Sequence, residues 1–302
     1  MAFTNDSLIA AIKRRAAVPS VGQWSSAEIL ATADEEMRSY VLPLVRRVQE
    51  EHLLQASDYT VISSDAIGQP LGAQYRIPGR AIGGALRDVY LVDSDGGVVR
   101  PPRLSTDDLE GATWGLYLFS NCIHYVNRNG SCSAPTLRMT YYLRPSALVL
   151  EAAAGRVTGY DANAHSITIA AAPAAFAGQT SFDIVRGRPG FEMLGFDLPG
   201  SITGTTVTLT GVLPNDIAVG DWVCLPEESP VPQIPAELHP LLAERVAFTY
   251  LKIEDPEAAA ASAKTLEEMQ AGAMLLLGQR IQGSPKKIVP AANGLFRRGG
   301  LW

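Results

Sequence analysis

Near the N-terminus, apolar residues recur every three or four positions, over 5–15 and again over 25–54. This spacing places them on one face of a helix, so both segments are predicted to be amphipathic helices. The second begins with Ser25-x-x-Glu28, a pattern typical of a capping box at a helix N-terminus. Pro43 lies inside the same segment and is expected to kink or split the helix, because proline removes a backbone donor.

The pattern changes between Asp58 and Pro232, where short β-branched and aromatic runs are separated by Gly, Pro, Asn and Asp. Such spacing is typical of an antiparallel sandwich or barrel. Asn129-Gly130 predicts a hairpin turn between "CIHY" and "LRMTYYL", since both residues tolerate positive φ angles. No strand–helix–strand alternation occurs, which disfavours a parallel doubly wound sheet.

Helical periodicity returns at Ala236. Pro240 fits only the first turn of a helix, and Asp255 followed by Pro256 is typical of the start of another. The helices are expected to end near Gly283, because glycine often follows a helix C-terminus.

Each helical block alone would leave an apolar stripe exposed, whereas together the two blocks can bury it. The sequence therefore predicts an α+β fold: a helical bundle made from the N- and C-terminal helices, with a large inserted antiparallel β-sandwich or barrel-like domain. The corresponding segments are 1–57, 58–235 and 236–283, followed by an extended tail over 284–302.

Composition narrows the possible functions. The 302 residues carry a formal charge of −6, and an acidic balance argues against a dedicated nucleic-acid binder. Three cysteines do not suggest a disulfide framework, so a reducing compartment is the simplest interpretation. No apolar run approaches the length of about 18 residues needed to span a membrane, and no membrane partner is expected.

The stretch "QYRIPGRAIGGALRDVYLVD" (74–93) combines arginines with adjacent glycines, which raises the possibility of a phosphate-binding loop. Gly79 and Gly84 have the right separation, but Ala85 and Leu86 stand where the lysine and the hydroxyl are needed. The stretch is therefore interpreted as a turn or bulge before a strand, where glycine permits unusual backbone angles.

Evidence for catalysis or metal binding is weak. Cys122, His124 and Cys132 could approach one another across a hairpin, but a closed zinc site would lack a fourth ligand. The simpler interpretation is a buried thiol and a histidine on a sheet face. The remaining histidines are scattered and no nucleophile elbow is present, so neither an enzyme nor a cofactor is expected.

The tail is basic and apolar without periodicity. Its apolar residues suggest docking onto a protein surface, where aromatic anchors carry much of the binding energy. The candidate binding residues of the tail are Lys286, Lys287, Phe296, Arg297, Arg298 and Trp302.

With this layout, the chain resembles the head-to-tail adaptor, or connector, proteins of tailed bacteriophages. "TADEEMRSYVLPLVRRVQEEHLL" resembles their long N-terminal helix, and "QYRIPGRAIGGALRDVYLVDSDGG" resembles their extended segment entering the β region. "LPNDIAVGDWVCLPEESPVPQIPAELHPLLAERVAFTYLK" resembles their final β segment and its junction with the C-terminal helices.

The resemblance implies a structural, non-enzymatic neck protein made in the bacterial host cytoplasm and located in the virion, at the head–tail interface. It implies a homo-oligomeric ring of twelve copies, packed through 25–54 and 236–282, with a portal protein on one side. A downstream neck or tail protein would lie on the other side. Genomic DNA would pass through the lumen without sequence-specific binding, and 285–302 would bind the portal.

In this setting the stretch 74–93 is interpreted as a hinge between the helical ring and the β domain. Its arginines would contact another subunit or a neighbouring ring. The hinge and inter-subunit candidates are Arg76, Pro78, Arg80, Gly83, Gly84 and Arg87.

Two alternatives remain open. One is another phage structural protein, from the tail, the baseplate or the capsid surface. The other is a carbohydrate-binding β-domain protein with Trp114, Tyr117, Tyr141 and Tyr142 as a sugar platform, although alternating strand aromatics also suit a core.

Overall fold

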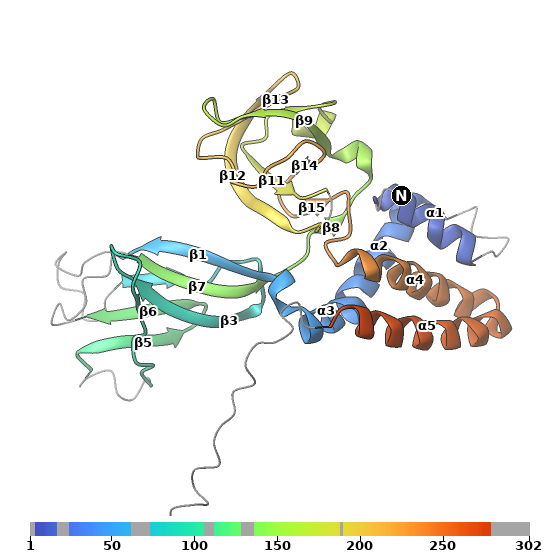
Figure 1. Cartoon of the computed structure of the whole chain (residues 1–302), viewed down its shortest axis with the longest axis horizontal. Helices are drawn as coiled ribbons and strands as arrows, with labels where there is room; N and C mark the ends of the chain where they lie inside the picture. Colours follow the sequence, from blue (N-terminus) through green and yellow to red (C-terminus); the bar gives the residue numbers. More distant parts are fainter. Residues whose placement is uncertain are drawn as a thin grey trace, which may run out of the picture.

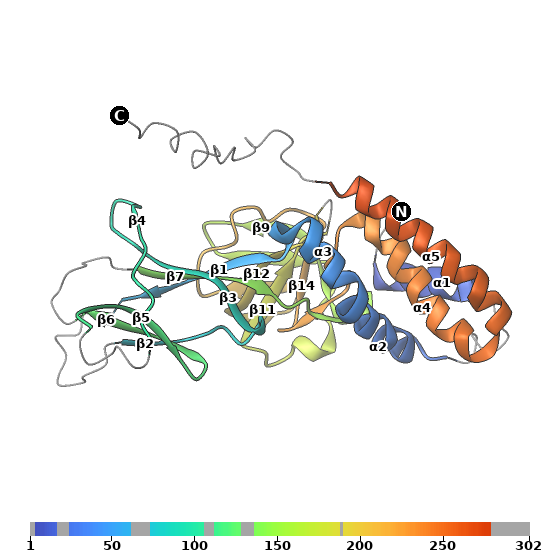
Figure 2. The same ribbon diagram turned by 90° about the horizontal axis from the view of Figure 1, so that it is seen from below.

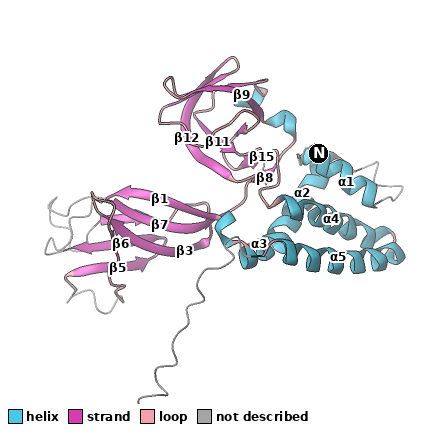
Figure 3. Cartoon of the chain, in the orientation of Figure 1, coloured by secondary structure: helices cyan, strands magenta, loops and turns pink. Residues whose placement is uncertain are grey.

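The computed structural model describes residues 4–16, 24–61, 73–105, 112–127, 136–187 and 190–278. Helices and strands are segregated in space, as expected for an α+β protein (Figure 1, Figure 3). The helices form one body, and the strands form a closed barrel and a pair of open sheets (Figure 1).

The α-helices come from the two ends of the described chain, and three come before the first strand. Their bounds are α1 Asn5–Ala16, α2 Ser26–Glu36, α3 Leu42–Val48, α4 His239–Glu254 and α5 Pro256–Leu276.

The helix starts follow the local sequence signals. The Ser25 side chain accepts a hydrogen bond from the Glu28 backbone N–H, and the Glu28 carboxylate accepts one from the Ser25 backbone N–H, which confirms the capping box. The predicted first-turn place of Pro240 is also confirmed. Asp255 caps α5 by accepting from the backbone N–H of Ala258.

The helix containing Pro43 changes geometry one turn before the proline. Met37–Val41 is a π-helical turn, in which the Leu42 N–H donates to the carbonyl of Met37. Pro43 has no N–H for the carbonyl four residues earlier, and its ring crowds that group, so the wider turn relieves the conflict. The helix then ends at Val48, earlier than predicted, and the chain enters strand β1 at Leu54.

Helices from both ends share one apolar core, which includes Ile12, Ile29, Val246 and Leu266. Polar contacts reinforce the packing: Arg245 Nε lies 2.8 Å from a Glu36 carboxylate oxygen. Figure 2 shows the helices from the two ends of the chain lying side by side in this body.

Two open sheets face each other across a separate apolar core that includes Leu91, Tyr125 and Met139. A four-stranded sheet has the order β1-β7-β3-β4, and a three-stranded sheet has the order β2-β6-β5. The strands are β1 Leu54–Thr60, β2 Ala73–Arg76, β3 Ala81–Val92, β4 Val98–Val99, β5 Trp114–Phe119, β6 Cys122–Asn127 and β7 Thr136–Leu143.

The hairpin predicted around Asn129-Gly130 would pair β6 with β7, and this prediction is wrong. Strand β6 pairs with β2 and β5, whereas β7 pairs with β1 and β3 in the other sheet. The turn residues themselves lie outside the described residues. Because β6 and β7 belong to different sheets, a local turn signal could not give the partner of either strand.

The barrel is closed in the order β10-β13-β12-β11-β14-β9, around a core that includes Ile167, Phe176, Phe182 and Val223. A short parallel pair, β8 with β15, lies outside it. The strands are β8 Ala147–Leu148, β9 Gly155–Asp161, β10 Ser166–Ile169, β11 Ser181–Val185, β12 Met193–Thr203, β13 Thr206–Leu209, β14 Trp222–Cys224 and β15 Glu228–Ser229.

Candidate functional site

Arg80 joins the open sheets to the barrel. It lies in the turn just before β3, and only 5% of the residue is exposed. Its two terminal nitrogens donate to both carboxylate oxygens of Asp183 on β11, at 2.7 and 3.2 Å. One of them also donates to Asp197 on β12, at 3.0 Å. A two-pronged arginine–carboxylate pair fixes orientation as well as distance, so the junction is held in one geometry.

The partner carboxylate is itself enclosed. The backbone N–H groups of Asp197 and Glu227 donate to Asp183 at 2.9 and 3.0 Å. Both donors have positive φ angles, 52° and 66°, an uncommon conformation for residues with side chains. Burial raises the pKa of Asp183, while Arg80 and these backbone groups oppose the rise. The surrounding backbone is therefore shaped to hold one buried ion pair.

This geometry corrects the expectation for Arg80. Its side chain is enclosed within its own chain, so it is not available as a contact with another subunit. Arg87 instead lies on the surface and pairs with Glu50 at 2.6 Å, which links β3 to the end of the first helical block. Arg76 is exposed and Pro78 is half-buried.

Gly83 and Gly84 interrupt the pairing of β3 with β7. Their φ angles are 63° and 64°, and the register shifts between Ala81 and Leu86. Ala81 pairs with Leu143 and Leu86 pairs with Tyr141, so β3 advances five residues where β7 advances two. Of the turn or bulge expected before a strand, a glycine bulge is present, but it lies inside β3 and not before it. Whether the bulge acts as a hinge remains a prediction.

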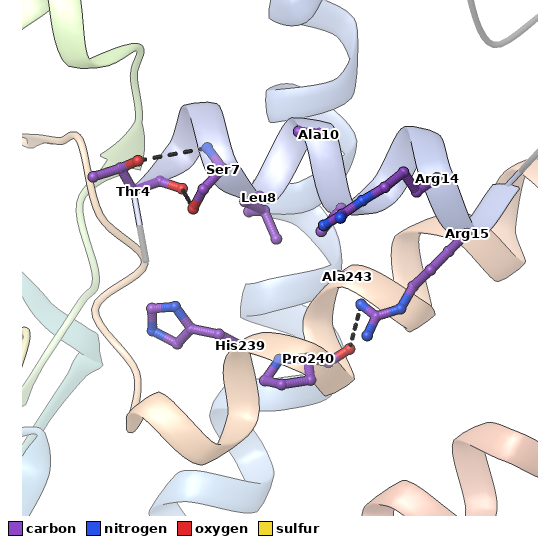
Figure 4. A pocket seen from close by; sticks show the side chains of 10 residues that line it. Thr4, Ser7, Leu8, Ala10, Arg14, Arg15, His239, Pro240 and Ala243 are labelled. Atoms are coloured by element: carbon purple, nitrogen blue, oxygen red, sulfur yellow. Dashed lines mark hydrogen bonds between the residues drawn. The ribbon is translucent and has the colours of Figure 1, made fainter. Parts of the chain in front are cut away.

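A groove of about 690 Å³ lies between α1 and the start of α4 (Figure 4). Leu8, Pro240 and Ala243 give it an apolar lining, and Arg14 and Arg15 supply cationic groups. Arg15 is engaged within the chain, because it donates to the carbonyl of Pro240 and pairs with Glu244 at 3.1 Å. Arg14 is exposed, and its side chain lies along the groove (Figure 4).

His239 closes one end of the groove. It is buried, its ring lies against that of Phe191, and its Nε2 is 3.2 Å from the carbonyl oxygen of Ile234. Burial lowers the pKa of His239 to about 4 because the charged ring would lose its hydration. The groove therefore presents a neutral histidine at neutral pH.

The metal hypothesis gains no support from the described residues, which contain no group of three or more His, Cys, Asp or Glu side chains able to hold an ion. His124 is a residue of strand β6, stacked on Tyr117 with ring centroids 4.7 Å apart. Cys122 is partly buried and its thiol is free. Cys132 lies outside the described residues.

The aromatic residues considered as a sugar platform are largely internal. Tyr117, Tyr141 and Tyr142 are 5%, 0% and 9% exposed, and Trp114 is half-buried. Tyr141 and Tyr142 belong to the apolar cores beside the barrel and the helices. The arrangement of these four residues does not favour carbohydrate binding.

The six candidate residues of the tail lie outside the described residues, so the portal-binding hypothesis for them stays a prediction. Comparison of the sequence with protein-family models and with curated proteins gave no match. The resemblance to phage adaptors therefore rests on the three stretches quoted above. Within the described part of the chain, no helix combines the length and apolar character needed to cross a membrane.

Sequence reasoning missed the acidic partners of Arg80. Asp183 lies about a hundred residues away along the chain, Asp197 lies on β12, and Glu227 lies between β14 and β15. The available signal was an aspartate inside the apolar run "SFDIV", since a buried carboxylate needs a partner. That signal predicts a partner but does not identify it.

Proposed function

We propose that the chain is a structural neck protein of a tailed phage. Copies of it form a ring that joins the portal to the tail and surrounds the DNA channel. The observation that carries the proposal is the helical body, in which segments from both ends of the chain share one apolar core. This arrangement agrees with the helical bundle and β-rich insertion that the resemblance implies.

In the proposed ring, the bundle of N- and C-terminal helices provides the subunit contacts. The barrel and the open sheets belong to the inserted β region. The ion pair of Arg80 and Asp183 holds the open sheets in a fixed position relative to the barrel. Forces between head and tail would therefore pass through a rigid junction.

The charge of the chain suits a channel for DNA. A net charge of −6 disfavours tight binding to phosphates, whereas a basic wall would retain the passing duplex by releasing its counterions. Genomic DNA would therefore pass through the lumen without sequence-specific contact, and the protein would belong to the virion at the head–tail interface.

Native mass spectrometry and electron microscopy of the protein with the portal ring test this function. The expected result is a closed ring, with twelve copies as the starting hypothesis, seated on the portal. A chain that stays monomeric and does not bind the portal would overturn the proposal. Labelling of intact particles adds a second readout, because a neck protein occupies a single vertex. Labels spread over the capsid or along the tail would favour another structural role.

A further inference from the structure

The groove between α1 and α4 offers an apolar surface with cationic groups beside it. Leu8, Ala11 and Pro240 contribute apolar side chains. Exposed Arg14 lies along it, and Arg15 also belongs to its lining (Figure 4). Its matching partner must provide an apolar side chain together with negative charge.

The outer face of α5 has this chemistry. The helix buries Ala259, Leu266 and Ala273 against the rest of the helical body. On the opposite face Leu275 is 84% exposed, so a large apolar side chain is open to solvent there. This outer face consists of Glu257, Ala261, Lys264, Glu268, Ala271 and Leu275, with Glu267 beside it.

We infer that the outer face of α5 docks into the α1–α4 groove of a second copy of this chain. Leu275 would fill the apolar part, and Glu267 and Glu268 would approach Arg14. The spacing is compatible: Glu268 and Leu275 are seven residues apart, about 10.5 Å along a helix, and Ser7 and Arg14 have the same separation on α1. Placing Leu275 beside Ser7 and Glu268 beside Arg14 requires the two helices to run antiparallel.

The two surfaces are different patches of one subunit, and they share no residue. In Figure 1, α4 lies between α1 and α5, and it contacts both. When two copies bind through unlike patches, one copy keeps an unused groove and the other keeps an unused α5 face. Further copies can therefore add until the rotation between neighbours closes a ring. The inference rests on the proposed ring and specifies the interface from which it is built.

A second copy fits the groove better than the C-terminal segment of the same chain. The segment 279–302 carries five arginines and lysines and no acidic residue. It would bring positive charge to a groove already lined by Arg14 and Arg15, which is unfavourable. The α5 face has three glutamates and one lysine.

Charge reversal tests the contact in the full-length protein. Arg14→Glu should raise the dissociation constant between copies by about tenfold or more, because it faces the glutamates with like charge. The double change Glu267→Arg and Glu268→Arg should do the same. Combining all three substitutions in one chain should restore assembly. Arg100→Glu is the matched control, since Arg100 is 73% exposed on the open sheets, away from the groove. Sedimentation velocity and native mass spectrometry measure the outcome.

Disulfide trapping identifies the partners directly. Ser7→Cys lines the groove at the position paired with Leu275, and Leu275→Cys lies on α5, so mild oxidation of a mixture of the two variants should give cross-linked dimers. Each variant alone, and the wild-type chain with its natural cysteines, should give none. Cross-linking of the Leu275→Cys variant with itself would indicate a symmetric contact and overturn the inference.

The results separate the two proposals. Rings that form normally with Arg14→Glu, without trapping in the mixture, would overturn this interface and leave the neck function standing. A wild-type chain that never oligomerises, alone or with the portal ring, would overturn both.

Discussion

Loss of the Arg80 charge is expected to destabilise the fold strongly. Arg80→Met keeps most of the side-chain volume but leaves Asp183, which is fully buried, without its counter-charge. Removing one partner of a buried ion pair typically costs about 3–5 kcal/mol of unfolding free energy. Urea unfolding followed by circular dichroism measures the loss.

The matched control is Arg138→Met. Arg138 also forms a two-pronged pair, with Asp58 at 2.6 Å on both sides, but this pair is exposed to solvent. Exposed pairs contribute roughly 0–1 kcal/mol. Equal losses for the two variants would contradict the view that burial, and not pairing alone, gives Arg80 its importance.

His239 predicts a loss of stability in mild acid. Its pKa is about 4 in the folded chain and its ordinary value is 6.5, so the unfolded chain binds the additional proton first. Stability is therefore complete above pH 6.5 and falls as the pH decreases towards 4. At pH 5 the loss from this residue is about 2 kcal/mol.

Urea midpoints at pH 7 and pH 5 measure this contribution. His239→Gln has no imidazole to protonate and should reduce the difference between the two midpoints. His165→Asn serves as the control, because His165 lies at a turn of the barrel where φ is 50° and asparagine tolerates that conformation. If His239→Gln keeps the full wild-type pH dependence, the acid sensitivity arises elsewhere.

At the scale of elements, the bulge in β3 depends on Gly84. Gly84→Ala should cost about 1–2 kcal/mol, because φ is 64° and an added Cβ meets Asn121 Oδ1 at 3.3 Å. Gly159→Ala in β9 is the control: space at Gly159 is open and its change should stay within about 0.5 kcal/mol of wild type. Denaturant unfolding compares them.

The same position tests the hinge hypothesis. Gly84→Val adds branching at Cβ, which further restricts the backbone. If the bulge adjusts the β region during assembly, the folded variant should form fewer rings or bind the portal ring poorly. Normal rings on the portal would contradict the hinge and leave the bulge as a local feature of β3.

Helices were predicted better than strand pairings for a physical reason. The Ser25 cap, the disruption before Pro43 and the start of α5 all depend on residues within one or two turns. Strand partners depend on distant segments: Leu54 of β1 faces Tyr142 of β7. The Asn129-Gly130 signal favoured the neighbouring run, but β6 and β7 lie in two separate sheets that share one apolar core.

For the whole molecule, the sequence predicted the α+β class and the glycine bulge, but not the ion pair at the junction. Adjacent glycines indicate an unusual local backbone conformation, which the sequence shows directly. The contact between Arg80 and Asp183 forms only when the open sheets pack against the barrel. The arginine was therefore assigned to the surface. The groove was missed for the same reason, since it exists only after α1 packs on α4.

The tail gives the prediction that separates folding from attachment. The described apolar cores reach no further than Leu277, which is buried and whose carbonyl accepts a bond from Gln49. Deleting 285–302 should therefore leave the melting temperature and ring formation unchanged. The same deletion should abolish attachment to the portal ring, because it removes Phe296 and Trp302 as anchors together with four basic residues.

Thermal melting and co-sedimentation with the portal ring measure these two effects. Phe296→Ala with Trp302→Ala, which keeps the basic residues, should weaken attachment. A variant with all four basic residues changed to Ser keeps the anchors and tests charge alone. A lower melting temperature after deletion would mean that the tail contributes to the stability of the fold. Unchanged binding would mean that the portal is held by another surface.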